Sequence, residues 1–206
     1  MRVRTRRAGL CGVAVAALVC ASVATAALRD THTSVVQFAK APLAPKSAKS
    51  AFTQRGSLLP ASVTSTLKYA QTRRIASEVF AGGQTVRLFV APGARRTWCY
   101  AWAEQPGAPG SWIDEFAGCG PSSQPLSVGN DDTRITIVAN LLRVGRVLVK
   151  LSDGTVVQPA LRWVSAPINA GFLLYQPPNG VTVVEVTAMN GTSVVAKQTI
   201  TPMSTP

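Results

Sequence analysis

The chain has 206 residues, with 21 lysines and arginines, nine acidic residues and one histidine, and its formal net charge is +12. Because the histidine is His32, the rest of the chain cannot hold a nucleophile that needs an imidazole base or a histidine-liganded zinc ion. The charge is uneven: residues 1–7 carry four arginines, residues 27–77 a net +7 and residues 78–206 only +1. The basic character therefore belongs to the N-terminal part of the chain.

Residues 1–28 have the organisation of a secretion signal. The four arginines precede a stretch without charge from Ala8 to Leu28, and Ala24-Thr25-Ala26 supplies the small residues of a cleavage site. The alternative is an uncleaved membrane anchor, because about 20 uncharged residues are just long enough to span a bilayer. The alanine-rich composition favours cleavage. In both cases we expect the remaining chain to be secreted or membrane-tethered, outside the cytoplasm.

Residues 29–60 are dominated by alanine, proline, serine and lysine, without a sustained helical or strand period. This composition predicts a disordered basic linker. The cations of residues 29–74 suit anionic envelope polymers or lipid headgroups as partners, or they only keep the linker soluble and extended. Nucleic acid is excluded by the compartment and because the cations are not interleaved with aromatic residues.

Residues 61–201 are predicted to form one β-rich domain, and residues 60–80 are compatible with a short helix at its start. After Gly82-Gly83 the pattern changes to a period of two, and turn dipeptides such as Asp153-Gly154 and Asn190-Gly191 separate the apolar runs. Short strands at this spacing predict an antiparallel sandwich or barrel, and an immunoglobulin-like arrangement is compatible with them. The predicted strands are 86–90, 97–103, 134–139, 147–151, 172–175, 181–188 and 193–200, with a loop over 104–112.

Carboxylates are the remaining candidates for catalysis. A glycosidase needs two of them facing each other across a cleft, whereas Asp114 and Glu115 are adjacent, and Glu104 stands alone. Asp131 and Asp132 follow Gly129-Asn130, which is more typical of a turn than of a calcium site. The sequence therefore predicts no catalytic residue, no metal ligand and no cofactor.

Aromatic residues are the stronger functional candidates. Side chains alternate along a strand, so Trp98, Tyr100 and Trp102 share one face, and Trp112 follows in the predicted loop. An exposed row of this kind can stack against sugar rings, which would define a carbohydrate-binding module. We interpret the row instead as core, because large aromatics contribute most of the buried apolar area of a small domain.

Cys99 and Cys119 are the only cysteines beyond residues 1–28. Because we expect an oxidising compartment, we predict that they form a disulfide.

Several segments together resemble a known kind of protein. These are "VRLFVAPGARRTWCYAW", a later "GCG", "VLVKLSDGTVV", "GFLLY" and "VEVTAMNGTSVVAK". They are similar to exported β-rich domains of high-GC Gram-positive bacteria, which carry no assigned activity. The resemblance implies export, β architecture and a Cys99–Cys119 pair, and it transfers no catalytic residue. We therefore expect a non-enzymatic envelope module for binding or structure. A carbohydrate-binding module that uses Trp98, Tyr100 and Trp102 is the alternative, and an enzyme ranks third.

Overall fold

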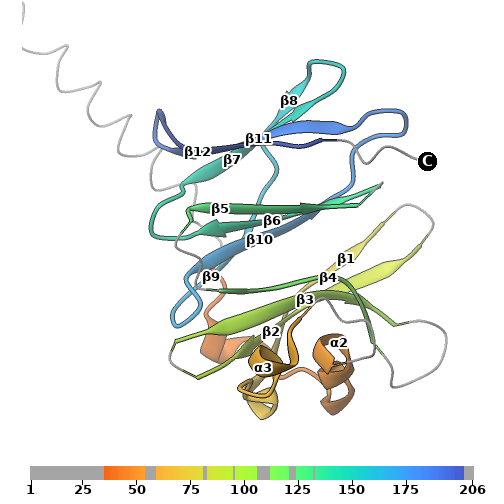
Figure 1. The fold of residues 1–206 in the computed structure, drawn as a ribbon, viewed down its shortest axis with the longest axis vertical. Coiled ribbons are helices and arrows are strands. Elements are labelled where there is room, and N and C mark those ends of the chain that lie inside the picture. The colour runs from red at the N-terminus through yellow and green to blue at the C-terminus, as the bar shows by residue number, and fades with distance from the viewer. Residues whose placement is uncertain are drawn as a thin grey trace, which may run out of the picture. The chain divides into compact units, whose positions relative to one another are not determined.

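The computed structural model describes residues 35–53, 59–80, 83–94, 96–105, 112–120, 124–131 and 133–201. They belong to one compact unit, residues 34–206. The predicted signal, residues 1–28, lies outside the described residues. Antiparallel strands form three sheets, which confirms the all-β prediction, and the described strands close no barrel (Figure 1).

Each sheet has four strands, named here in their spatial order. Sheet I consists of β1 (Arg73–Val79), β2 (Thr85–Pro92), β3 (Trp98–Glu104) and β4 (Ile113–Gly120). Sheet II consists of β5 (Leu126–Asn130), β6 (Ile135–Asn140), β10 (Ala170–Tyr175) and β9 (Arg162–Val164). Sheet III consists of β12 (Ser193–Thr199), β11 (Val183–Asn190), β7 (Arg146–Leu151) and β8 (Val156–Val157).

Sheet II is the middle layer because both of its faces are apolar. In β10, Phe172 packs with the sheet I core that includes Leu88, whereas the next residue, Leu173, packs toward the sheet III core that includes Val186. Successive residues of a strand point to opposite faces, so one strand serves both cores. The fold is thus two sandwiches that share one sheet, and the apolar runs of β6 and β10 are the sequence signature of that position.

The outer face of sheet I is covered by the N-terminal part of the unit. This N-terminal part contains the short helices that the structure describes, which are η1 (Phe38–Lys40), η2 (Lys46–Lys49), α2 (Ser50–Thr53), α3 (Ala61–Thr64) and η3 (Tyr69–Gln71). Figure 1 shows α2 and α3 against this sheet. Phe52, which is fully buried, packs with Leu67 onto the small side chains that β2 and β3 present there, among them Ala91 and Ala101. We call residues 44–71 the N-terminal layer.

The prediction of a disordered linker over residues 29–60 is therefore wrong for residues 35–53. Val36 exchanges main-chain hydrogen bonds with Trp163 and Ser165 beside β9, and Phe38 is buried between sheets I and II. Residues 29–34 and 54–58 lie outside the described residues. Composition was misleading because only a few large side chains, such as Phe52, anchor this segment, and the sheet face that receives them lies far away in the sequence.

The helix considered for residues 60–80 is limited to α3 and the 3₁₀ turn η3, and residues 73–79 form strand β1 instead. Besides β1, four strands were not predicted: β4, β5, β8 and β9. They are short, or they contain glycine and acidic residues that hide the period of two. The predicted turns hold, since Gly154 and Gly191 both have positive φ angles and lie in the β7–β8 and β11–β12 hairpins.

Candidate functional site

The aromatic row of β3 lies in the core between sheets I and II. Trp98, Tyr100 and Trp102 are 4%, 7% and 1% exposed, and the rings of Trp98 and Tyr100 both contact Phe172 of sheet II, with centroids 5.5 Å apart in each case. The core interpretation is confirmed. Buried rings offer no open face for a sugar ring to stack on, so these three residues do not form the platform that the carbohydrate alternative required.

Two of these rings lie over glycines of the neighbouring strand. In the β3–β4 register Trp98 is opposite Gly120, and Tyr100 is opposite Gly118. A Cβ atom added at Gly118 would lie 2.8 Å from the Tyr100 ring, and one at Gly120 would overlap the Trp98 ring. The glycines of the "FAGCG" segment therefore give the large rings of β3 room to lie flat across β4.

Trp112 is also buried, at 2% exposure, and it anchors the N-terminal layer. Its backbone N–H donates to Ser50 Oγ over 2.8 Å, and its indole N–H donates to Ser47 Oγ over 3.2 Å. Its ring meets Phe89 edge-on at 4.9 Å, and the Arg87 guanidinium lies over it at the same distance. The structure therefore separates Trp112 from the aromatic row of β3, because sheet I lies between them.

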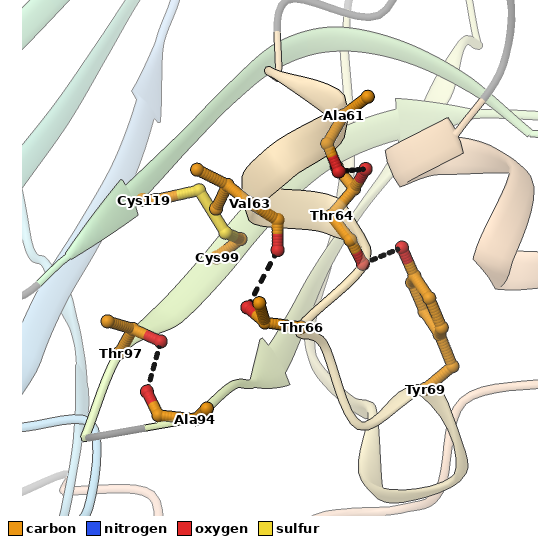
Figure 2. The surroundings of a disulfide bond; sticks show 9 residues. All are labelled: Ala61, Val63, Thr64, Thr66, Tyr69, Ala94, Thr97, Cys99 and Cys119. Carbon is orange, nitrogen blue, oxygen red and sulfur yellow. Dashed lines mark hydrogen bonds between the residues drawn. A yellow bond between two sulfur atoms is a disulfide. The ribbon is translucent and has the colours of Figure 1, made fainter.

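Cys99 and Cys119 form the predicted disulfide, with an S–S distance of 2.05 Å. They are directly opposite each other on β3 and β4, so the bond joins two neighbouring strands. Cys99 is fully buried beneath the N-terminal layer, where Val63 of α3 packs on its cluster, whereas Cys119 is exposed (Figure 2). A disulfide indicates an oxidising compartment outside the cytoplasm.

The close-up also shows how side-chain hydrogen bonds shape the chain over the disulfide. The hydroxyls of Thr64 and Thr66 donate to the carbonyls of Ala61 and Val63, and the Tyr69 hydroxyl donates to the Thr64 carbonyl over 2.8 Å (Figure 2). Each of these carbonyls also accepts a main-chain hydrogen bond, so the side chains add a second bond to the carbonyls of this short helical segment.

Two carboxylates meet at the end of the core between sheets I and II. Glu115 is the extra residue of a β-bulge in β4, and the Gln84 amide nitrogen donates to Glu115 over 2.9 Å and also to Glu104 of β3. Arg134, just before β6, lies 2.7 Å from Glu115 in a largely buried ion pair. Burial raises the pKa of Glu115, and the neighbouring Arg134 opposes that shift.

This arrangement is a cross-link between sheets I and II. A glycosidase needs an open space between its two carboxylates, whereas here the amide of Gln84 occupies it. Asp131, a further candidate, accepts hydrogen bonds from the backbone N–H groups of Thr133 and Arg134, as expected for a turn. Asp132 and the Asp114 side chain lie outside the described residues. Within the described ranges, no three side chains of the metal-binding types gather into a group that could hold an ion.

The basic residues predicted to lie on a linker are instead carried on folded structure. We call residues 35–74 the basic segment; it contains no acidic residue, and its described cations are Lys40, Lys46, Lys49, Lys68, Arg73 and Arg74. All of them are exposed except Arg73, which donates to the Ala41 carbonyl over 2.9 Å. The Lys49 ammonium lies 5.1 Å from the centre of the Tyr69 ring, next to Lys68 in the chain. Packing of the N-terminal layer thus places the Lys49 ammonium against Tyr69 of η3.

A cleft of about 690 Å³ lies between β4 and β5, the edge strands of sheets I and II. This volume is in the range of ligand-binding sites, about 300–1,000 Å³. Trp98 and Tyr100 form part of its wall, with polar residues such as Asn130 and Asn140 around them. Sequence reasoning missed this cleft because neither β4 nor β5 was recognised as a strand.

No helix in the part of the chain described here combines the length and the apolar composition needed to cross a bilayer. No protein-family model, curated protein or solved structure matches the chain. The resemblance to exported domains of high-GC Gram-positive bacteria therefore stays a prediction.

Proposed function

We propose that the chain is an exported, non-enzymatic module of the cell envelope that binds anionic surfaces through its basic segment. The observation that carries the proposal is the absence of any acidic residue from residues 35–74, while five of the described cations there are exposed. Because these cations are carried by packed structure, less conformational entropy is lost when they bind than a flexible linker would lose.

Two features support binding rather than catalysis. Both cysteines of the compact unit are joined in the Cys99–Cys119 disulfide, so neither supplies a thiolate nucleophile. The paired carboxylates Glu104 and Glu115 are bridged by Gln84. The disulfide and the predicted signal segment support export.

The ligand chemistry is a dense array of phosphate groups, which occurs both in anionic lipid headgroups and in polymers of the cell wall. Each lysine or arginine close to an anionic membrane contributes about 1 kcal/mol to binding. The attraction between exposed charges decays over about 8 Å at physiological salt, so binding should weaken steeply as salt increases.

The test compares two charge-reversal variants of residues 34–206 that change the net charge equally. Lys46→Glu with Lys68→Glu alters the basic segment, whereas Arg96→Glu with Lys150→Glu alters exposed cations elsewhere. Binding is measured by sedimentation with phosphatidylglycerol vesicles and by titration with soluble polyphosphate. We expect the first variant to bind about 30-fold more weakly, which corresponds to about 2 kcal/mol, and the second to bind almost as tightly as the unaltered protein.

The two arms of the experiment separate the two sources of phosphate. Binding to vesicles alone assigns lipid headgroups, and binding to polyphosphate alone assigns a wall polymer. Equal losses in the two variants would show that only net charge matters and would overturn the proposal. Absence of binding in both arms at low salt would overturn it as well.

A further inference from the structure

The cleft between β4 and β5 lies where two sheets present their edges side by side. β4 is the last strand of sheet I, and β5 is the first strand of sheet II. Edge strands keep main-chain N–H and C=O groups that no neighbouring strand has paired. A cleft at this position therefore has hydrogen-bonding main chain on two of its sides.

The residues that line the cleft show that β4 and β5 expose their main chain to it. Side chains alternate between the two faces of a strand, so a surface formed by side chains would contain every second residue. Here the lining includes the consecutive residues 115–120 of β4 and 127–130 of β5. Uninterrupted runs of this kind arise when a strand turns its backbone edge toward the cleft.

Both edges contain glycines. Gly118, Gly120 and Gly129 all line the cleft, and the ring atoms of Trp98 and Tyr100 occupy the space that a Cβ would need at the first two. At Gly118 and Gly120 these rings therefore fill the space of the missing side chains and form part of the cleft wall. Apolar side chains such as Phe116 complete the wall.

The charge and hydrogen-bonding state of the wall narrow the ligand chemistry. The Glu115 carboxylate is already paired with Arg134, and Asp131 already accepts hydrogen bonds within its own turn. The indole N–H of Trp98, in contrast, is buried and has no acceptor in the described part of the chain. Arg96 also lines the cleft and is exposed, so the wall carries one accessible cation. The buried indole and the main-chain edges suit a ligand that carries carbonyl acceptors and main-chain donors.

We infer that this cleft binds an extended peptide segment of another protein by strand addition to the edges of β4 and β5. Main-chain hydrogen bonds supply most of the recognition in this mode, and alternate side chains enter the apolar part of the cleft. This site lies outside the basic segment, so the inference stands independently of the proposed function.

The experiment follows the backbone amide signals of isotope-labelled residues 34–206 by NMR. The probe is a blocked peptide of alternating threonine and valine, about six residues long, the usual length of a strand. We expect shifts confined to residues 115–120, 127–130 and their direct neighbours. Ser127→Trp, an exposed β5 position that lines the cleft, should weaken binding at least about tenfold. Ser193→Trp, exposed on β12, is the matched control and should leave binding unchanged.

Two further probes make the outcome decisive. The same peptide with all of its amides N-methylated has no N–H donor on either edge and cannot form a strand ladder. It should therefore not bind, and equal binding would overturn strand addition. A soluble chito-oligosaccharide tests the other ligand class, and shifts in the cleft with this sugar alone would replace the peptide inference. Absence of shifts with the unmodified peptide at millimolar concentration would also overturn it, because main-chain recognition tolerates most sequences.

Discussion

At the scale of single residues, large rings of the core are matched with glycines on the neighbouring strand. Trp98 lies over Gly120 and Tyr100 over Gly118, and in sheet II the Trp163 ring lies over Gly171 in the same way. A glycine normally weakens a strand, but here it accepts a ring that fills the space of the missing side chain. These pairs explain why strands rich in glycine still form part of a packed sandwich.

Gly120→Ala tests this matching. The added methyl group would overlap the Trp98 ring, which packs against Phe172 and has little room to move, so we expect a loss of about 1–3 kcal/mol from overpacking. Gly129→Ala is the control, because its Cβ would lie 3.1 Å from the Thr136 methyl group and 3.8 Å from the Phe116 ring, without overlap. Urea denaturation followed by tryptophan fluorescence measures both variants. Equal stabilities would contradict the proposed overlap.

The ionisation of Glu115 predicts a pH dependence with a definite sign. Burial raises the pKa of Glu115 in the folded state above the ordinary value of 4.5, so folding favours its protonated form. The contribution of this protonated form to the free energy of unfolding is fully present below pH 4.5, and it is lost as the pH rises through the folded-state pKa of Glu115. Glu115→Gln cannot ionise. The free energy of unfolding of the natural protein, relative to this variant, should therefore fall as the pH is raised from about 4 to about 7.

Glu185 provides a control of opposite sign. A hydrogen bond from Lys197 lowers the pKa of Glu185 in the folded state, so its stabilising contribution is present at neutral pH and is lost on acidification. Relative to Glu185→Gln, the natural protein should become more stable as the pH rises. Parallel pH profiles for the two variants would contradict the assignment of a burial effect to Glu115.

At the scale of elements, the β3–β4 pair is the best-secured part of sheet I. The disulfide joins opposite residues of these strands, and the bulge at Glu115 attaches β4 to sheet II through Arg134. β4 is also an edge strand, so it gains no support from a further neighbour in its own sheet. The disulfide and the Glu115–Arg134 ion pair thus hold β4 in place, while its unpaired edge faces the cleft.

Reduction of the disulfide should lower stability while the fold persists. Closing a loop of 20 residues stabilises a protein by about 3 kcal/mol in the chain-entropy description, and we expect reduction to lower the free energy of unfolding by a similar amount. Thiol titration of the denatured, unreduced protein checks the bond itself and should find no free thiol in residues 34–206. The Cys99→Ala, Cys119→Ala protein serves as control, since reducing agent should leave its stability unchanged. Two titratable thiols in the natural protein would refute the pairing.

At the scale of the whole molecule, the compact unit is a stack of three sheets with the N-terminal layer against sheet I. Each pair of adjacent layers has its own apolar core, so the N-terminal layer contributes to stability as a sheet would. This explains why β2 and β3 are buried on both faces, a pattern that an exposed antiparallel sheet would not need.

Truncation distinguishes a structural layer from a linker. A chain that begins at residue 59 lacks Phe38 and Phe52, and loss of one such buried ring typically costs about 3–5 kcal/mol, a large part of the stability of an ordinary domain. We expect this chain to melt at a much lower temperature or to be unfolded. A chain that begins at residue 34 should melt like the natural protein. If both truncated chains melted alike, the packing role of residues 35–53 would be wrong.

The sequence by itself determined the all-β class, most turns, the disulfide partners and the burial of the β3 aromatic row. Each follows from local information: a period of two, glycine at positive φ, the only two cysteines beyond the signal segment, and three large rings on one strand face. Export, the nature of the partner and the absence of catalysis stay predictions.

Only the tertiary structure decided that residues 35–53 are folded, that Glu115 meets Arg134, and that β4 and β5 border a cleft. These features depend on contacts between segments far apart in the chain. Phe52 is buried because β2 and β3 present small side chains to it, and β4 is an edge strand because β5 begins a different sheet. Local periodicity carries no information on which strand lies beside which, since that is chosen by the free energy of packing the whole chain.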